Sequence, residues 1–142
     1  MGGVMVSGAA HRFPVRVYYE DTDAGGIVYH ASYLRFMERA RTEWLRAEGF
    51  EQQRLRDEHG LMFTVSRLCI DYRLPAVYDD RLEVGVKIAR ARRASLDLAQ
   101  DVYREDGRLM ASANVQVACL NATTMRPCPM PRPLRSELER DT

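Results

Sequence analysis

Residues 18–33 gather side chains that could carry out catalysis. The segment reads YYEDTDAGGIVYHASY and places three acids (Glu20, Asp21 and Asp23) and His30 between a predicted strand and a predicted helix. Loops held between regular elements are common positions for catalytic groups. A carboxylate in this loop could attack an electrophilic carbon or activate a water molecule as a general base.

Other chemistries find little support in the sequence. The pair Gly25-Gly26 has neither the GxGxxG spacing of dinucleotide-binding loops nor a following Gly-Lys-Ser. The three histidines, His11, His30 and His59, are too far apart for an HxxxH or HExxH metal motif. We therefore expect neither a metal nor a cofactor.

The hydrophobic pattern predicts the elements on either side of this loop. Residues 13–19 alternate as a strand, and Pro14 near its start favours an edge position. Apolar residues at helical spacing predict an amphipathic helix of roughly four turns over residues 33–47, which Gly49 ends. A shorter and more polar helix is expected over residues 51–58.

From Met62 onward the apolar residues recur with a period of two. Four alternating segments follow, with Asp106-Gly107 as a strong hairpin signal and Ala91-Arg92-Arg93 as a weaker turn. The order of strand, long helix and four antiparallel strands predicts an α+β fold of the hot-dog type. In that fold a curved antiparallel five-stranded sheet wraps one long helix.

This arrangement has a consequence for assembly. A ferredoxin-like alternative would need a second substantial helix between strands, and the pattern contains none. A single helix leaves the edges of the sheet uncovered, so we expect two subunits to pair edge strands.

Length and composition indicate one globular domain. The chain has 142 residues, of which 46% are hydrophobic, so it can bury a core. Its 21 basic and 20 acidic residues nearly cancel, which removes the electrostatic case for nucleic-acid binding. We find no apolar stretch that predicts a signal peptide or membrane insertion, and three cysteines, an odd number, favour a cytoplasmic location. We expect a flexible tail (1–12), a hot-dog domain (13–122) and a C-terminal extension (123–142).

The segment DTDAGGIVYHASYLRFMERARTEWL resembles the signature of the 4-hydroxybenzoyl-CoA thioesterase superfamily. It is most similar to the Tol-Pal-associated, YbgC-like acyl-CoA thioesterases, and the similarity runs from about Arg16 to about Asn121, including IDYRLPAVYDD. The resemblance implies the hot-dog fold, a homodimer or homotetramer and no metal. It also implies hydrolysis of an acyl-CoA thioester to a free carboxylic acid and coenzyme A.

The resemblance assigns roles to single residues as well. Asp23, the second aspartate of the motif, corresponds to the family's catalytic carboxylate, and Tyr19 and His30 flank it in the YbgC-like branch. The backbone N–H near His30 corresponds to the donor that polarises the substrate carbonyl. Arg92 and Arg93 match a basic turn that contacts the phosphates of coenzyme A in related thioesterases.

Elementary chemistry agrees with these roles. A helix N-terminus presents unpaired N–H groups and partial positive charge, so it can stabilise negative charge that develops on a thioester oxygen. Asp23 could attack the carbonyl to give a mixed anhydride, or it could activate water, and the sequence leaves both routes open. His30 could position water or the carboxylate, or protonate the departing thiolate.

The same residues have simpler structural interpretations. Asp23 could cap a turn, Tyr19 could pack in the core, and the arginine pair at 92–93 could form an ordinary solvated hairpin. Glu20 and Asp21 are expected in solvent, where Asp21 could also cap or orient the loop.

Two other functions stay open at this point, because a fold does not fix a function. The chain could be a non-catalytic protein that binds acyl-CoA or an acyl carrier, or an interaction partner of envelope or lipid-synthesis proteins. The sequence also leaves open whether the acyl group arrives on coenzyme A or on acyl carrier protein.

Overall fold

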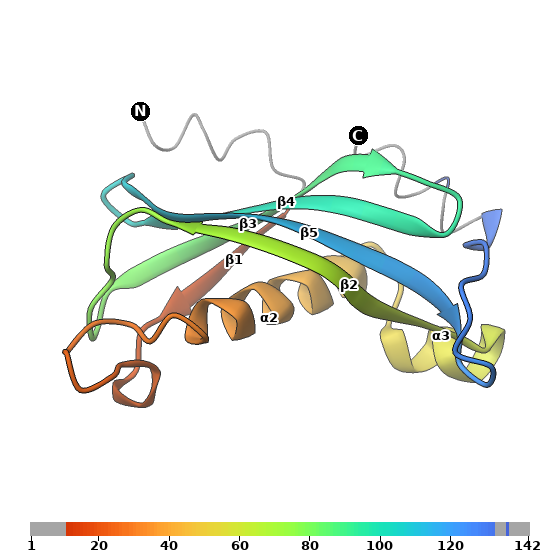
Figure 1. Ribbon diagram of the computed structural model, residues 1–142, viewed down its shortest axis with the longest axis horizontal. Coiled ribbons are helices and arrows are strands. Elements are labelled where there is room, and N and C mark those ends of the chain that lie inside the picture. Colours follow the sequence, from red (N-terminus) through yellow and green to blue (C-terminus); the bar gives the residue numbers. More distant parts are fainter. Residues whose placement is uncertain (1–10, 133–135, 137–142) are drawn as a thin grey trace.

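The computed structural model describes residues 11–132 and Ser136. One five-stranded antiparallel sheet, with the spatial order β1-β3-β4-β5-β2, arches over the long helix (Figure 1). The elements are β1 (His11–Arg16), η1 (Tyr19–Asp21), α2 (Ser32–Ala47), α3 (Gln52–His59), β2 (Leu61–Tyr72), β3 (Arg81–Ala91), β4 (Ser95–Arg104) and β5 (Leu109–Asn121). The predicted tail up to residue 10, and the predicted C-terminal extension beyond residue 132 except Ser136, lie outside the described residues.

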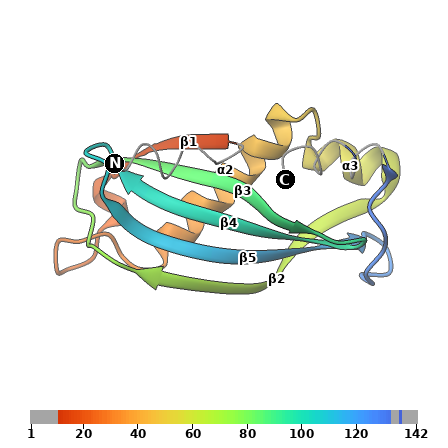
Figure 2. The ribbon, with the colours of Figure 1, turned by 90° about the horizontal axis from the view of Figure 1, so that it is seen from above.

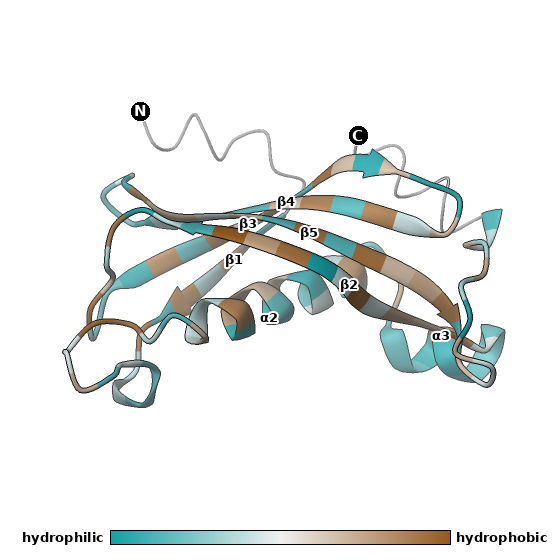
Figure 3. Ribbon diagram, viewed as in Figure 1, coloured by the Kyte–Doolittle hydropathy of each residue, from teal (hydrophilic) through white to brown (hydrophobic). Residues whose placement is uncertain are grey.

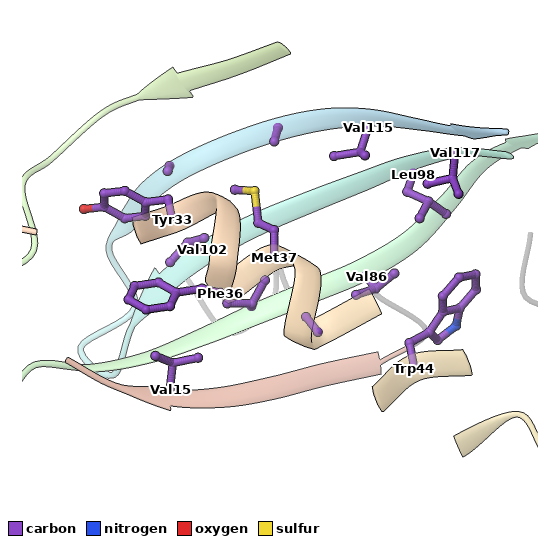
Figure 4. Packing of buried hydrophobic residues seen from close by; sticks show 14 of the residues in the cluster. Val15, Tyr33, Phe36, Met37, Trp44, Val86, Leu98, Val102, Val115 and Val117 are labelled. Atoms are coloured by element: carbon purple, nitrogen blue, oxygen red, sulfur yellow. The ribbon is translucent and has the colours of Figure 1, made fainter. Parts of the chain in front are cut away.

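Helix α2 forms where the sequence predicts it and packs under the sheet. Its apolar stripe is buried against β1, β3, β4 and β5, with Phe36, Met37 and Ala40 fully buried and Trp44 at 2% exposure (Figure 4). Gly49, with φ of +89°, follows the helix in a conformation that L side chains rarely adopt, which explains why glycine stands there. The polar helix α3 follows, and most of its ribbon has the teal colour of hydrophilic residues (Figure 3).

The strands bury alternate residues as the period of two predicts. Val84, Val86, Leu98 and Val115 face the core, and each is at most 1% exposed. The predicted hairpin between β4 and β5 is confirmed: Gly107 has a φ of +90°, and its N–H donates to the carbonyl of residue 104. The strands therefore form the single curved layer that the hot-dog prediction requires (Figure 2).

The two edge strands differ in length and in exposed apolar surface. β1 has six residues and carries Pro14, so the predicted edge position of that proline is confirmed. β2 has twelve residues, pairs on one side with β5, and exposes Val65 and Tyr72 at 41% and 46%. No other strand within residues 11–132 covers the second side of β2.

The chain bends away from β1 earlier than predicted. The predicted strand over residues 13–19 is wrong at its end, because β1 stops at Arg16 and residues 19–21 form the 3-10 turn η1. The Val17 N–H bonds to the Asp80 carbonyl, and the Asp21 carboxylate accepts the Tyr18 N–H, which together turn the backbone. Within the described part of the chain, neither helix is long and apolar enough to cross a bilayer.

Candidate active site

Asp23 stands at the tip of a tight turn between η1 and α2. Its N–H donates to the Ile27 carbonyl at 2.9 Å, and Gly26, with φ of +83°, donates its N–H to the Asp23 carbonyl at 3.0 Å. The side chain is exposed, and its Oδ1 accepts the Gly25 N–H at 2.8 Å. Asp23 thus caps a turn, as its simpler interpretation predicts. Its second oxygen, Oδ2, has no partner among the described residues.

Asp21 anchors this loop and is not the solvated acid that the sequence suggested. It is 5% exposed, and its Oδ2 accepts the Tyr18 N–H at 2.8 Å. Its carbonyl accepts the Tyr29 N–H at 2.9 Å and the Ser32 hydroxyl at 3.1 Å, which ties η1 to the start of α2. The expectation that Asp21 could orient the loop agrees with these contacts, whereas the expected exposure is wrong. No periodic signal in the sequence distinguishes this buried acid from its exposed neighbours.

The start of α2 presents open backbone donors next to His30. The Ser32 N–H bonds to the Tyr29 carbonyl at 2.8 Å, but within the described residues the N–H groups of His30 and Ala31 have no acceptor. The imidazole of His30 is exposed and lies beside the rings of Tyr29 and Tyr72, with centroids 4.5 and 6.3 Å away. The Tyr72 hydroxyl donates to the His30 carbonyl at 2.9 Å, so edge strand β2 supports the loop.

A second tyrosine, Tyr33, holds the neighbouring loop between β2 and β3 in place. The Ala76 N–H donates to the Tyr33 hydroxyl at 3.2 Å, and Ile27 forms a bridge with Val77. Burial raises the pKa of Tyr33, which keeps this hydroxyl neutral. The loop 73–80 and the loop 18–30 are therefore held as one unit at this end of the sheet.

Tyr19 faces solvent and does not pack in the core. Its side chain is 83% exposed, and its ring meets the edge of Tyr78 at a centroid distance of 6.3 Å. It makes no hydrogen bond or ring contact with Asp23 or His30 within the described residues. The structure thus brings Asp23 and His30 into one loop and leaves Tyr19 at the rim of that end.

Arg92 and Arg93 lie at the opposite end of the sheet. They follow strand β3, which starts at the end of the sheet that carries Asp23. The eleven residues of β3 are roughly 35 Å long, and this length separates the two ends. Arg92 Nη1 contacts Asp97 Oδ1 at 2.5 Å. Burial works to raise the pKa of Asp97, but hydrogen bonds from Arg92 and Gln116 outweigh it and lower that pKa. Arg93 is exposed, whereas Arg92 is partly exposed and paired with Asp97, so Arg93 is the more open of the two to an external anion.

A cavity of about 380 Å³ also lies far from Asp23 in the same subunit. It sits between the second half of α2 and strands β2, β4 and β5. Arg41 is on its rim and donates to Gln100 Oε1 at 3.0 Å, while burial lowers the pKa of the Arg41 guanidinium. Most of the other lining residues are apolar, and four are polar: Trp44, Leu45, Phe63, Val65, Leu96, Leu98 and Val117, with Glu38, Thr42, Gln52 and Thr64. This composition suits a hydrocarbon group better than a charged one.

Within residues 11–132 no three side chains of the His, Cys, Asp or Glu type come together in a way that could hold a metal ion. The groups available for chemistry at the Asp23 loop are a carboxylate, an imidazole and backbone N–H donors. These groups fit acyl transfer to water, in which negative charge develops on a carbonyl oxygen.

Comparison with known proteins identifies the family. The model of the thioesterase-like superfamily matches residues 17–138. The chain belongs to this superfamily, which confirms the prediction made from the loop and helix motif.

Individual relatives agree with that membership. The chain is 46% identical to acyl-CoA thioesterase YbgC of Haemophilus influenzae, over 87% of this chain and 90% of the relative. It is 44% identical to acyl-CoA thioester hydrolase YbgC of Escherichia coli O6:H1, over 90% and 95%.

Solved structures confirm the hot-dog prediction. A probable thioesterase from Bartonella henselae matches with a TM-score of 0.81 and 35% identity, over 85% of this chain and 98% of that chain. A 1,4-dihydroxy-2-naphthoyl-CoA thioesterase from Synechocystis matches with a TM-score of 0.83 and 25% identity, over 90% and 94%.

Proposed function

We propose that this protein is an enzyme that hydrolyses acyl-CoA thioesters to a free carboxylic acid and coenzyme A. The observation that carries the proposal is the loop of residues 23–30, which combines an exposed carboxylate with open N–H groups at the start of α2. The YbgC relatives, acyl-CoA thioesterases by name, support the same activity. The cytoplasm, where acyl-CoA is available, is the proposed location.

The residues of this loop have complementary roles in the proposed reaction. The N–H groups of His30 and Ala31 stabilise the oxyanion that forms when the thioester carbonyl is attacked. Asp23 either attacks the carbonyl carbon itself or removes a proton from the attacking water. The imidazole of His30 positions water or the carboxylate, and Tyr19, which flanks this loop at the rim, is proposed to act on the substrate rather than on Asp23 or His30.

One subunit holds only part of this site. Arg93, proposed to bind the phosphates of coenzyme A, and the apolar cavity, proposed to hold the acyl group, both lie at the end of the sheet away from Asp23. A single substrate molecule cannot use all three within one chain. A second copy of the chain has to supply the missing half.

Edge strand β2 offers the way to join two copies. Thr64 on β2 and Ser95 on β4 pair with the same residue of the intervening strand β5, so the two lie in one row across the sheet. Ser95 directly follows the arginine turn. Antiparallel pairing of β2 with the same strand of a second copy would bring this row toward the other subunit's Tyr72 and His30. We propose this homodimer as the active unit, and a homotetramer would be two such dimers.

The first test measures thiol release from short aliphatic, long aliphatic and aromatic acyl-CoA esters. We expect Asp23→Asn to lower turnover by at least about a thousandfold while binding of acyl-CoA is kept. Asp57→Asn, an exposed aspartate on α3, is the matched control and should keep full activity. Tight binding of acyl-CoA by the wild type without turnover would favour the non-catalytic alternative. Turnover of acyl carrier protein esters alone would show that the substrate is carried by that protein and not by coenzyme A.

A second test asks whether the two halves come from different subunits. We expect Asp23→Asn to be nearly inactive and Arg93→Ala to be impaired at acyl-CoA concentrations well below KM, and the two are co-expressed so that mixed dimers form and are assayed at such concentrations. In a mixed dimer, one of the two sites has both native residues. About half of the dimers in an equal mixture are mixed, so about a quarter of all sites should be native. No recovery in purified mixed dimers would show that Arg93 does not act across the interface.

A further inference from the structure

Two thiols face each other at the end of β5. The Sγ atoms of Cys119 and Cys128 lie 4.0 Å apart, and both residues are free cysteines. Cys119 is fully buried, whereas Cys128 is partly exposed. The third cysteine, Cys69, is exposed on β2 and lies outside this pair.

Backbone contacts hold the two cysteines in register. Pro127 forms an antiparallel bridge with Leu120, and the Cys128 N–H donates to the Cys119 carbonyl at 2.9 Å. Cys119 and Cys128 therefore lie opposite each other beside the Leu120–Pro127 bridge and share one backbone hydrogen bond. Opposite residues of antiparallel strands have Cα atoms about 4.5–5.5 Å apart. Disulfides use Cα separations of roughly 4.4–6.8 Å, so the sulfurs can bond through side-chain rotation with little movement of the backbone.

We propose that Cys119 and Cys128 are a modification site, at which a hydroperoxide converts them into an intramolecular disulfide. The cross-link fixes the segment 126–130 against β5. This inference concerns a site apart from the Asp23 loop, and its formation does not depend on the proposed activity.

The chemistry proceeds in two balanced steps. The Cys128 sulfur, the one that solvent reaches, attacks the peroxide; the O–O bond breaks and leaves a sulfenic acid on Cys128 and a molecule of water or alcohol. The Cys119 sulfur then attacks the sulfenic sulfur, the S–O bond breaks, and water departs with the Cys119 proton. Two electrons pass from the thiols to the peroxide. Burial raises the pKa of Cys119 to about 12, which makes this thiol a poor nucleophile toward peroxide, so that Cys128 is the one that reacts first.

The segment that the disulfide would fix also contacts the arginine turn. The Met130 N–H donates to the Arg93 carbonyl at 2.9 Å, and the Met130 side chain is 5% exposed. The Cys119 N–H donates to the carbonyl of Ala94, the next residue of the turn, at 2.8 Å. Oxidation therefore closes a covalent ring over residues 119–128, next to the β3–β4 turn to which Cys119 and Met130 are hydrogen-bonded.

The test treats the full chain with hydrogen peroxide, blocks remaining thiols with N-ethylmaleimide under denaturing conditions and measures intact mass. Wild type and Cys69→Ser should each lose two reactive thiols per chain, and unreduced digests should contain one peptide pair joining Cys119 to Cys128. Cys128→Ser, which leaves the buried Cys119 in place, should form no such pair. Both thiols remaining reactive, Cys128 stopping at a sulfinic acid, or a bond that joins two chains through Cys69 would each overturn the proposal.

A second measurement tests the effect on the segment. Oxidised wild type should slow amide hydrogen exchange over residues 126–130 and raise the thermal unfolding midpoint by roughly 5 °C, and a dithiol reductant should reverse both. Peroxide-treated Cys128→Ser should show neither change. An oxidised wild type that exchanges as fast as the reduced form would show that the bond does not fix the segment.

Discussion

The two ends of the sheet differ in what they expose and in how they are held. The end with the loop 18–33 presents Asp23, His30 and open N–H groups to solvent, and a few buried groups such as Asp21 keep it in place. The opposite end combines a largely apolar cavity, the arginine turn and the segment 126–130. Under the proposed function, the chain thus separates the groups for the reaction from the groups for recognition. Under the proposed function, pairing of two copies is a catalytic requirement as well as a source of stability.

The largest expected effect comes from disrupting the proposed dimer contact along β2, which would separate the two ends that the proposed site combines. Val65 is 41% exposed on β2. In the proposed dimer, Val65→Lys would replace this apolar side chain of the strand contact with a charge, whose burial costs free energy. We expect a monomer by light scattering and a fall in kcat/KM of at least about a hundredfold. Pro14→Lys, on the other edge strand, should change neither mass nor activity. A monomeric Val65→Lys variant with full activity would remove the two-copy site.

The next comparison sets Asp21 against Asp23 within the reactive end. Asp21→Ala removes the acceptor of the part-buried hydrogen bond from the Tyr18 N–H, so we expect a loss of about 1–2 kcal/mol in the free energy of unfolding and about a tenfold lower kcat. Asp23→Ala should instead abolish turnover and shift urea unfolding by less than about 1 kcal/mol, because its side chain is exposed. Equal stability losses for the two variants would contradict this division. Asp21→Asn should recover part of the lost stability.

At the end of the sheet with the arginine turn, substitutions of the two arginines should likewise differ, one affecting KM and the other affecting stability. Arg93→Ala should raise KM for acyl-CoA about tenfold with unchanged stability, because it removes a charged contact to phosphate. Arg92→Ala should cost at most about 1 kcal/mol of unfolding free energy through its half-exposed pair with Asp97, with a smaller change in KM. Steady-state kinetics and urea unfolding distinguish the two variants. An unchanged KM in Arg93→Ala would exclude this turn from binding.

The smallest expected effect is a pH dependence at the same end. The folded-state pKa of Asp97 is lowered below its ordinary value of 3.8, because hydrogen bonds from Arg92 and Gln116 outweigh its burial. Its contribution to stability is therefore present above about pH 4 and is lost as the pH falls through the folded-state pKa. Urea unfolding should show a deficit for Asp97→Asn relative to wild type at about pH 6 that shrinks at about pH 3. A deficit independent of pH would assign the effect to packing.

The sequence predicts the elements better than it predicts their neighbours. The spacing of Met37 and Trp44 defines the buried stripe of α2, and Asp106-Gly107 locates a hairpin that the structure confirms. Periodicity reports which face of an element is buried, but it does not report which residues meet across strands. The burial of Asp21 and the pairing of Cys119 with Cys128 both depend on such contacts, so neither could be predicted.

The candidate site shows the same limit. Asp23 and His30 are close in sequence, and one loop keeps them close in space. Arg93 was assigned to the same site by resemblance, although an eleven-residue strand separates the two ends. Tyr19 alternates with core residues in sequence, but the turn at η1 rotates it into solvent.

The hydrogen bond from the Tyr72 hydroxyl to the His30 carbonyl links assembly to chemistry. Tyr72 ends the strand that we propose joins two copies, so ordering that strand in a dimer also orders the loop that carries the open N–H groups. The rate per molecule should then fall on dilution below the dissociation constant of the dimer. Cells that make little of this protein would hold mostly idle subunits, and activity would rise more steeply than expression.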